Sequence, residues 1–105
     1  MIMGKFTLKP AHTFKAKADI PLHGGGVSPV EFEFRHRTRD ELEAWLKDSV
    51  ERSDVDAILD MTSGWELEDA FGRESVEQLV QSYMGAARSI FDKYIDTLAQ
   101  RRLGN

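Results

Sequence analysis

Apolar and polar residues alternate in two segments near the N-terminus, a pattern typical of half-buried β-strands. Residues 13–20 read TFKAKADI and residues 30–36 read VEFEFRH, so apolar side chains alternate with charged ones. Residues 21–29, PLHGGGVSP, separate the two segments, and three consecutive glycines accept the positive φ values that a chain reversal needs. The pattern predicts a β-hairpin with a long loop.

The charges on the two predicted strands favour antiparallel pairing. Lys15 and Lys17 would lie opposite Glu31 and Glu33, and each cross-strand pair of opposite charges contributes about 0.2–1 kcal/mol. A two-stranded hairpin is only marginally stable by itself, so we expect its apolar face to pack against the segments that follow. The aromatic residues of that face are Phe14, Phe32 and Phe34.

After residue 37 the apolar period lengthens to that of a helix. The segment TRDE, Thr38–Glu41, has the residues of a capping box and predicts a helix that begins at Arg39. A second helix is predicted to begin after Ser53 or Asp54 as the N-cap. Gly64 would end it, because a glycine accepts the positive φ that often follows the last helical residue.

Three further helical segments are predicted after Trp65. Residues 66–72, ELEDAFG, are expected to form one or two turns that end at Gly72, and residues 74–83 carry apolar side chains at helical spacing. The last helix is expected to run from Met84 or Ala86 to Arg102, with a break from the preceding helix near Met84.

These elements predict an α+β fold that is mainly α. An N-terminal β-hairpin would pack on a bundle of four to five short helices. The length of 105 residues suits a single domain over residues 1–105, with a hairpin region at 1–37 and a helical region at 38–105.

Composition narrows the classes of partner. The net charge of −4 and the pI near 5.3 argue against nucleic acid, which requires a dense basic face. The apolar runs are too short for a membrane span, and the N-terminal residues do not resemble a signal peptide. Without cysteine there is no disulfide framework, which suits a reducing cytoplasm.

Residue types that carry chemistry are present but lack the necessary spacing. The histidines His12, His23 and His36 show no metal-ligand pattern, and the three glycines lack the Lys and Ser/Thr that follow in a phosphate-binding loop. Asp54 and Asp56 form a DxD motif that is better explained by the dipole at a helix N-terminus. We therefore predict no catalytic, cofactor-binding or metal-binding residues and a protein that is not an enzyme.

Large apolar side chains are numerous for this size, with two Trp, two Tyr, six Phe and four Met. Most of them should form the core, since large aromatic residues are usually well buried. A small domain can leave some of them exposed, and an exposed apolar patch of several hundred Å² marks a protein contact. The composition thus indicates protein binding as the functional class.

The sequence resembles the tail assembly chaperones of long-tailed bacteriophages and prophages. The resemblance is carried by the Ser63-Gly64-Trp65 corner, the segment up to Phe71, the helix ending in Tyr83, the AARSIFDKY segment and the terminal GN. The N-terminal hairpin also fits, so the similarity covers nearly the whole chain. The chain departs from the family pattern at Met84-Gly85, where a proline is expected.

The resemblance implies a non-enzymatic protein of the host cytoplasm that is absent from the mature virion. Such proteins coat the long, apolar, helical tape-measure protein and leave as tail-tube subunits polymerise around it. The resemblance also implies self-association and a longer, frameshifted form whose extension engages the tail-tube protein. The alternative function is a small oligomerisation or adaptor module whose apolar faces meet an unrelated protein partner.

Five aromatic residues are the candidates for partner binding, and none of them has a motif that would single it out. They are Trp65, Phe71, Tyr83, Phe91 and Tyr94.

Trp65 separates two hypotheses that one variant can test. If Trp65 fills a core corner between the second helix and the faces of Leu79 and Phe91, Trp65→Ala should cost about 3–5 kcal/mol of stability. If Trp65 is a contact anchor, stability should change little while partner binding falls. The core hypothesis is favoured, because Leu67 and Phe71 follow Trp65 at helical spacing. Thermal melting and a binding assay on this variant distinguish the two.

Overall fold

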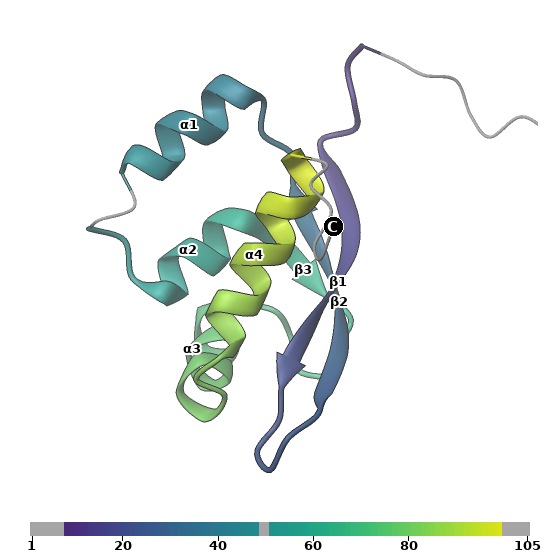
Figure 1. The fold of residues 1–105 in the computed structure, drawn as a ribbon, viewed down its shortest axis with the longest axis vertical. Helices are drawn as coiled ribbons and strands as arrows, with labels where there is room; N and C mark the ends of the chain where they lie inside the picture. Colours follow the sequence, from purple (N-terminus) through teal and green to yellow (C-terminus); the bar gives the residue numbers. More distant parts are fainter. Residues whose placement is uncertain (1–7, 49–50, 100–105) are drawn as a thin grey trace, which may run out of the picture.

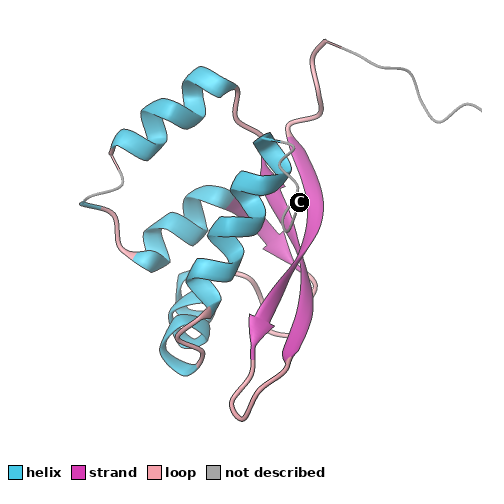
Figure 2. Cartoon of the chain, in the orientation of Figure 1, coloured by secondary structure: helices cyan, strands magenta, loops and turns pink. Residues whose placement is uncertain are grey.

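The computed structural model describes residues 8–48 and 51–99, which fold into three β-strands and four α-helices. The sheet is antiparallel with the strand order β1-β2-β3, and α2 and α4 contact its strands (Figures 1 and 2). The fold is therefore α+β, as predicted. In chain order the elements are β1 (Thr13–Pro21), β2 (Val27–Arg35), α1 (Arg39–Lys47), α2 (Asp54–Met61), β3 (Thr62–Trp65), α3 (Arg73–Ser82) and α4 (Ala86–Ala99).

The predicted hairpin is confirmed in both its register and its turn. Lys15 lies opposite Glu33 and Lys17 opposite Glu31, so the charges on the outer face alternate in sign across the strands. The three glycines Gly24–Gly26 have φ values of 84°, 105° and 78°. Residues with a Cβ rarely adopt such values, which explains the run of glycines at the turn.

The third strand was not predicted. Gly64 was expected to end a helix with positive φ, and this was wrong: α2 ends at Met61, and Thr62 has φ −124° and ψ 151°. The chain passes directly from α2 into β3, where Trp65 lies opposite Phe32 and Gly64 opposite Glu33. A four-residue strand that contains a glycine has too little alternation to be recognised, and its partner β2 is about thirty positions away in the sequence.

The predicted helical turns over residues 66–72 were also wrong, because this segment is a loop. The Glu66 amide donates to the Glu31 carbonyl at 3.1 Å, and the Glu66 carboxylate accepts from the Glu31 amide at 2.7 Å. The Trp65 Nε1–H donates to the Asp69 carbonyl at 2.7 Å. These bonds to β2 and to the indole replace the internal hydrogen bonds of a helix.

The other helix boundaries agree with the prediction where they can be compared. At α1 the Thr38 hydroxyl accepts from the Glu41 amide and the Glu41 carboxylate accepts from the Thr38 amide, which completes the capping box. The Ser53 hydroxyl caps α2. α3 and α4 are separate helices with the break near Met84, and the expected end at Arg102 lies outside the described residues.

The core lies between the sheet and the helices, as the hairpin pattern predicted. Phe32 and Phe34 are fully buried, and Phe14 stacks on Phe34 with 5.5 Å between ring centroids. The helices contribute Ile58, Met61, Val76, Ile90 and Tyr94, all almost completely inaccessible to solvent. The Cβ of a residue at position 85 would lie 3.0 Å from the Pro21 ring, so Gly85 lets the α3–α4 turn approach the end of β1 closely.

The capping box of α1 gives a stability prediction. Thr38→Ala removes the acceptor of the Glu41 amide and should lower the free energy of unfolding by about 1 kcal/mol. Thr38→Ser retains the hydroxyl and should stay close to the wild type. Urea unfolding of the three proteins measures both effects, and equal stability of the Ala and Ser variants would contradict the role assigned to the cap.

Candidate functional site

An open groove between α2 and α4 is the best candidate for a binding site. Its volume is about 350 Å³. The rim carries Arg52, Asp54 and Arg88. The walls are mainly apolar and are formed by Ala57, Ile58, Met61, Met84, Ala87 and Phe91.

Helical spacing explains why these side chains share one hollow. The wall residues of α2 are Ala57, Ile58 and Met61, which lie within one turn of each other on one side of the helix. From Met84 onward the wall residues recur at intervals of three and four positions, so they also project from one side. Ala57 and Ala87 both belong to the walls, and a methyl group leaves space that a larger side chain would fill. The small residues therefore keep the groove open.

Met84 is the most exposed wall residue of the groove. The residue is 91% exposed and lies two positions before α4 begins at Ala86. A methionine side chain is flexible and polarizable, so it adapts to apolar partners of different shape.

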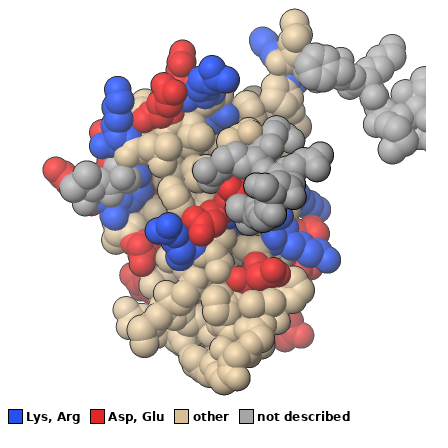
Figure 3. Space-filling view, in the orientation of Figure 1, with Lys and Arg blue, Asp and Glu red and all other residues tan. Residues whose placement is uncertain are grey.

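In Figure 3 charged side chains gather on the upper part of the molecule, while the lower end, where Figure 1 shows the hairpin tip and α3, is largely uncharged in this view. Leu22 and Val27 of the hairpin tip are also exposed.

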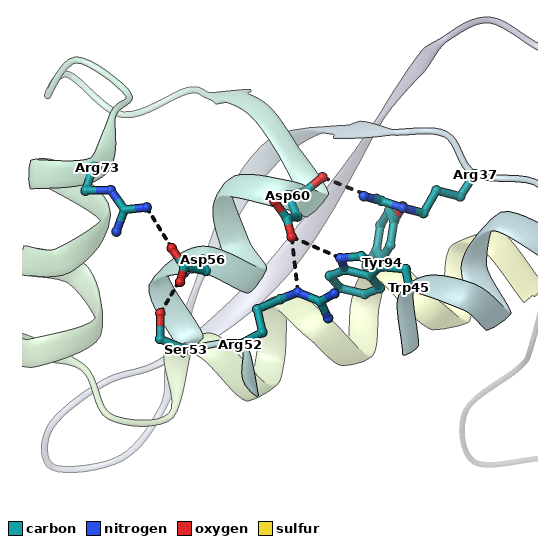
Figure 4. A network of polar contacts seen from close by, with 8 residues as sticks. All are labelled: Arg37, Trp45, Arg52, Ser53, Asp56, Asp60, Arg73 and Tyr94. Carbon is teal, nitrogen blue, oxygen red and sulfur yellow. Dashed lines mark hydrogen bonds and ion pairs between the residues drawn. The ribbon is translucent and has the colours of Figure 1, made fainter. Parts of the chain in front are cut away.

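Trp45 of α1 lines the same groove and packs near Phe91, with 6.3 Å between ring centroids. Its Nε1–H donates to the Asp60 carboxylate at 3.0 Å, and Arg52 forms an ion pair with the same carboxylate at 3.1 Å (Figure 4). The guanidinium carbons of Arg52 and Arg37 lie 4.4 Å and 4.7 Å from the indole centroid. Cations over the ring and a hydrogen bond at its edge hold Trp45, and through it α1, in place.

Tyr94 is fully buried beside this cluster and belongs to the core. Its hydroxyl accepts from Arg37 at 2.8 Å and donates to the Arg35 carbonyl at 2.7 Å. Burial raises the pKa of Tyr94, and the hydrogen bond and charge of Arg37 partly oppose that rise. Tyr94 was a predicted contact residue, but its burial leaves no side-chain surface for a partner.

The three aspartates of residues 54–60, two of which form the DxD motif, have different surroundings. Asp56 forms an ion pair with Arg73 at 2.6 Å, and the hydrogen bond from Arg73, followed by that from Ser53, lowers the pKa of Asp56. Asp60 binds Trp45 and Arg52, whereas Asp54 lies on the groove rim. Within residues 8–48 and 51–99, no group of three or more His, Asp or Glu side chains is placed to hold a metal ion.

Trp65 and Phe71 lie away from the groove between α2 and α4. Trp65 is half-buried, with its ring edge-on to Phe71 at 5.1 Å and to Phe32 at 6.3 Å. It therefore packs at the border of the core in β3, and it does not fill the predicted corner against Phe91, which lines the groove instead. A second hollow of about 320 Å³ is lined by Trp65, Leu67, Leu79 and Tyr83 together with polar residues.

Tyr83 links the hairpin loop to the end of α3. The His23 and Tyr83 rings stack at 5.0 Å, and His23 Nε2 lies 2.9 Å from the Ser82 carbonyl. The five predicted contact residues are thus divided: Phe91 lies in the groove, Trp65 and Tyr83 line the second hollow, Phe71 supports Trp65, and Tyr94 is in the core.

Met84 and Ala87 of the groove were missed as candidate contact residues. The prediction used Met84 only as a helix boundary and placed Ala87 within the last helix. Ala87 follows Met84 by three positions and Phe91 follows Ala87 by four, and this helical spacing was a usable signal, but the sequence could not show which helix lies opposite.

Comparison with known families gives one match. A family model described as phage tail assembly chaperone matches residues 1–105, the whole chain. No curated protein and no solved structure matches the chain. In the described part of the chain, no helix has the length and apolar character needed to cross a membrane.

Tyr94 should make the stability of the protein depend on alkaline pH. The pKa of Tyr94 is raised in the folded state above the usual 10.0, because the folded protein favours the neutral hydroxyl. The contribution of Tyr94 to the free energy of unfolding is therefore complete below pH 10.0 and is lost as pH rises through the folded pKa. Tyr94→Phe should remove this part of the pH dependence and, at neutral pH, cost about 1–2 kcal/mol through the lost hydrogen bonds.

Urea unfolding of the wild type, Tyr94→Phe and Tyr83→Phe from neutral to alkaline pH measures both effects. Tyr83→Phe is the matched control because it leaves the Tyr94 hydroxyl intact. A Tyr94→Phe protein that loses stability with rising pH as steeply as the wild type would show that another group is responsible.

Proposed function

Because the chain belongs to the phage tail assembly chaperone family, we propose that it binds the tape-measure protein and keeps it soluble during tail assembly. The binding site in this proposal is the groove between α2 and α4. The observation that carries the proposal is the row formed by Met84, Ala87 and Phe91, which faces apolar residues of α2 across an open hollow.

The groove suits an amphipathic helical segment of the tape-measure protein. Helices bind grooves of this kind by placing apolar anchors that recur every three or four residues against the walls. The charged rim, with Arg52, Asp54 and Arg88, would meet the polar flanks of such a helix. The net charge of −4 would help to keep the complex in solution.

A chaperone of this kind must also release its client. Arg88 is already paired with Asp92 at 3.2 Å on the protein surface, and both side chains remain exposed. A partner would therefore gain most from the apolar walls, and exposed ion pairs add little affinity. Such contacts suit displacement by tail-tube subunits better than buried charge pairs would.

The remaining parts of the proposal rest on the family alone. The chain acts in the host cytoplasm without enzymatic activity, helps to recruit the tail-tube protein and is absent from the mature virion. A frameshifted longer form is the proposed route to the tail-tube protein.

Co-expression with the tape-measure protein of the same phage or prophage tests the central claim. The wild-type chain should bring the tape-measure protein into the soluble fraction and co-purify with it. Met84→Glu places a charge on the groove wall and should strongly reduce both. Leu8→Glu is the matched control, because Leu8 is 90% exposed and Met84 is 91% exposed, and it should behave as the wild type.

The outcomes separate the site from the function. Normal melting temperatures for both variants would exclude unfolding as the cause. Retention of the tape-measure protein by Met84→Glu would overturn the groove as its site. Failure of the wild type, with both proteins well expressed, would contradict binding by this form of the chain.

A further inference from the structure

Within the described part of the chain, the outer edge of β1 presents backbone groups with which no other strand pairs. β1 ends the sheet order β1-β2-β3, and no other strand among residues 8–48 and 51–99 pairs with it. The His12 carbonyl accepts from the His36 amide, and the Leu22 amide donates to the Gly26 carbonyl, so even-numbered residues bond toward β2. Between these positions, alternation directs the backbone groups of Thr13, Lys15, Lys17 and Asp19 away from β2.

This edge lacks most devices that protect an edge strand. β1 is nine residues long, it pairs with β2 in continuous register, and its only proline is its last residue, Pro21. Lys15 and Lys17 lie on the outer face opposite glutamates of β2, so no charge points into the inner face of β1. A long, regular edge of this kind is a template for another strand.

We propose that a second copy of this chain pairs with the first through β1, antiparallel and around a two-fold axis at Ala18. In this register Lys17 of each copy lies opposite Asp19 of the other, and the two equivalent pairs follow from the symmetry. The two three-stranded sheets would join into one continuous sheet of six strands.

Charge selects this register over its neighbours. If the two-fold axis lay at Lys17, Lys17 of one copy would lie opposite Lys17 of the other. If the axis lay at Asp19, the two Asp19 side chains would lie opposite each other. Like charges directly opposite each other are destabilising, whereas opposite charges stabilise.

Pairing at this edge leaves the groove between α2 and α4 open. A hollow of about 250 Å³ beside the edge is lined by Lys17, Asp19 and, from α4, Ser89, Asp92 and Lys93. The groove uses Ala87, Arg88 and Phe91 of α4, which lie on another side of that helix. Self-association through β1 and binding in the groove are therefore separate properties.

A charge-swap series tests the register, with molar mass measured by sedimentation equilibrium over a range of concentrations. The wild type should form a dimer. Lys17→Asp and Asp19→Lys each create two like-charge pairs and should raise the dimer Kd about tenfold or more. The double variant Lys17→Asp/Asp19→Lys restores opposite charges and should recover the dimer.

Lys15→Asp is the matched control. Lys15 lies opposite Glu33 within the sheet, as Lys17 lies opposite Glu31, so both variants bring an aspartate opposite a glutamate in the same copy. In the proposed dimer Lys15 faces Pro21, which carries no charge, so Lys15→Asp should leave the Kd near the wild-type value.

Three results would each overturn the proposal. The first is a wild type that stays monomeric at all concentrations. The second is an equal increase of the dimer Kd by Lys15→Asp and Lys17→Asp. The third is a double variant that has the same melting temperature as the Lys17→Asp protein but does not recover the dimer. None of these results bears on binding of the tape-measure protein in the groove.

Discussion

Tyr94 connects the sheet, α1 and α4, and the arrangement of the candidate site depends on this contact. Its ring lies 5.4 Å from Phe34, 6.0 Å from Trp45 and 6.2 Å from Phe14 between centroids. Its hydroxyl bonds the Arg35 carbonyl at the end of β2 and accepts from Arg37. Because a buried hydroxyl must keep its partners, this arrangement fixes the position of α4 relative to the sheet.

The position of α4 determines both surfaces to which we assign partners. One side of α4 faces α2 across the groove, and another side lies beside the outer edge of β1. The groove is lined mainly by apolar side chains, whereas the strand edge offers backbone hydrogen bonds and charges of both signs. An apolar helix and a second β-strand are therefore different kinds of ligand, and the same small domain can present a site for each.

The candidate site was only partly predictable from the sequence. Apolar periodicity and capping residues identified the helices that bear Ile58 and Phe91, and the number of large apolar residues indicated a protein contact. Exposure was not predictable, because Tyr94 and Met84 are both large apolar residues in or beside the last predicted helix but are 0% and 91% exposed. Their burial depends on which helices and strands lie against them, and this is a property of contacts between distant segments.

The sequence by itself determined the features that arise from interactions within a few residues. These are the hairpin with its glycine turn, the capping box at Thr38 and the break between the last two helices. Only the tertiary structure decided that residues 62–65 form a strand, that residues 66–72 stay non-helical and that Trp65 lies at the border of the core. The reason is that β2, distant in the sequence, supplies the hydrogen bonds and the aromatic surface that outweigh local helix propensity there.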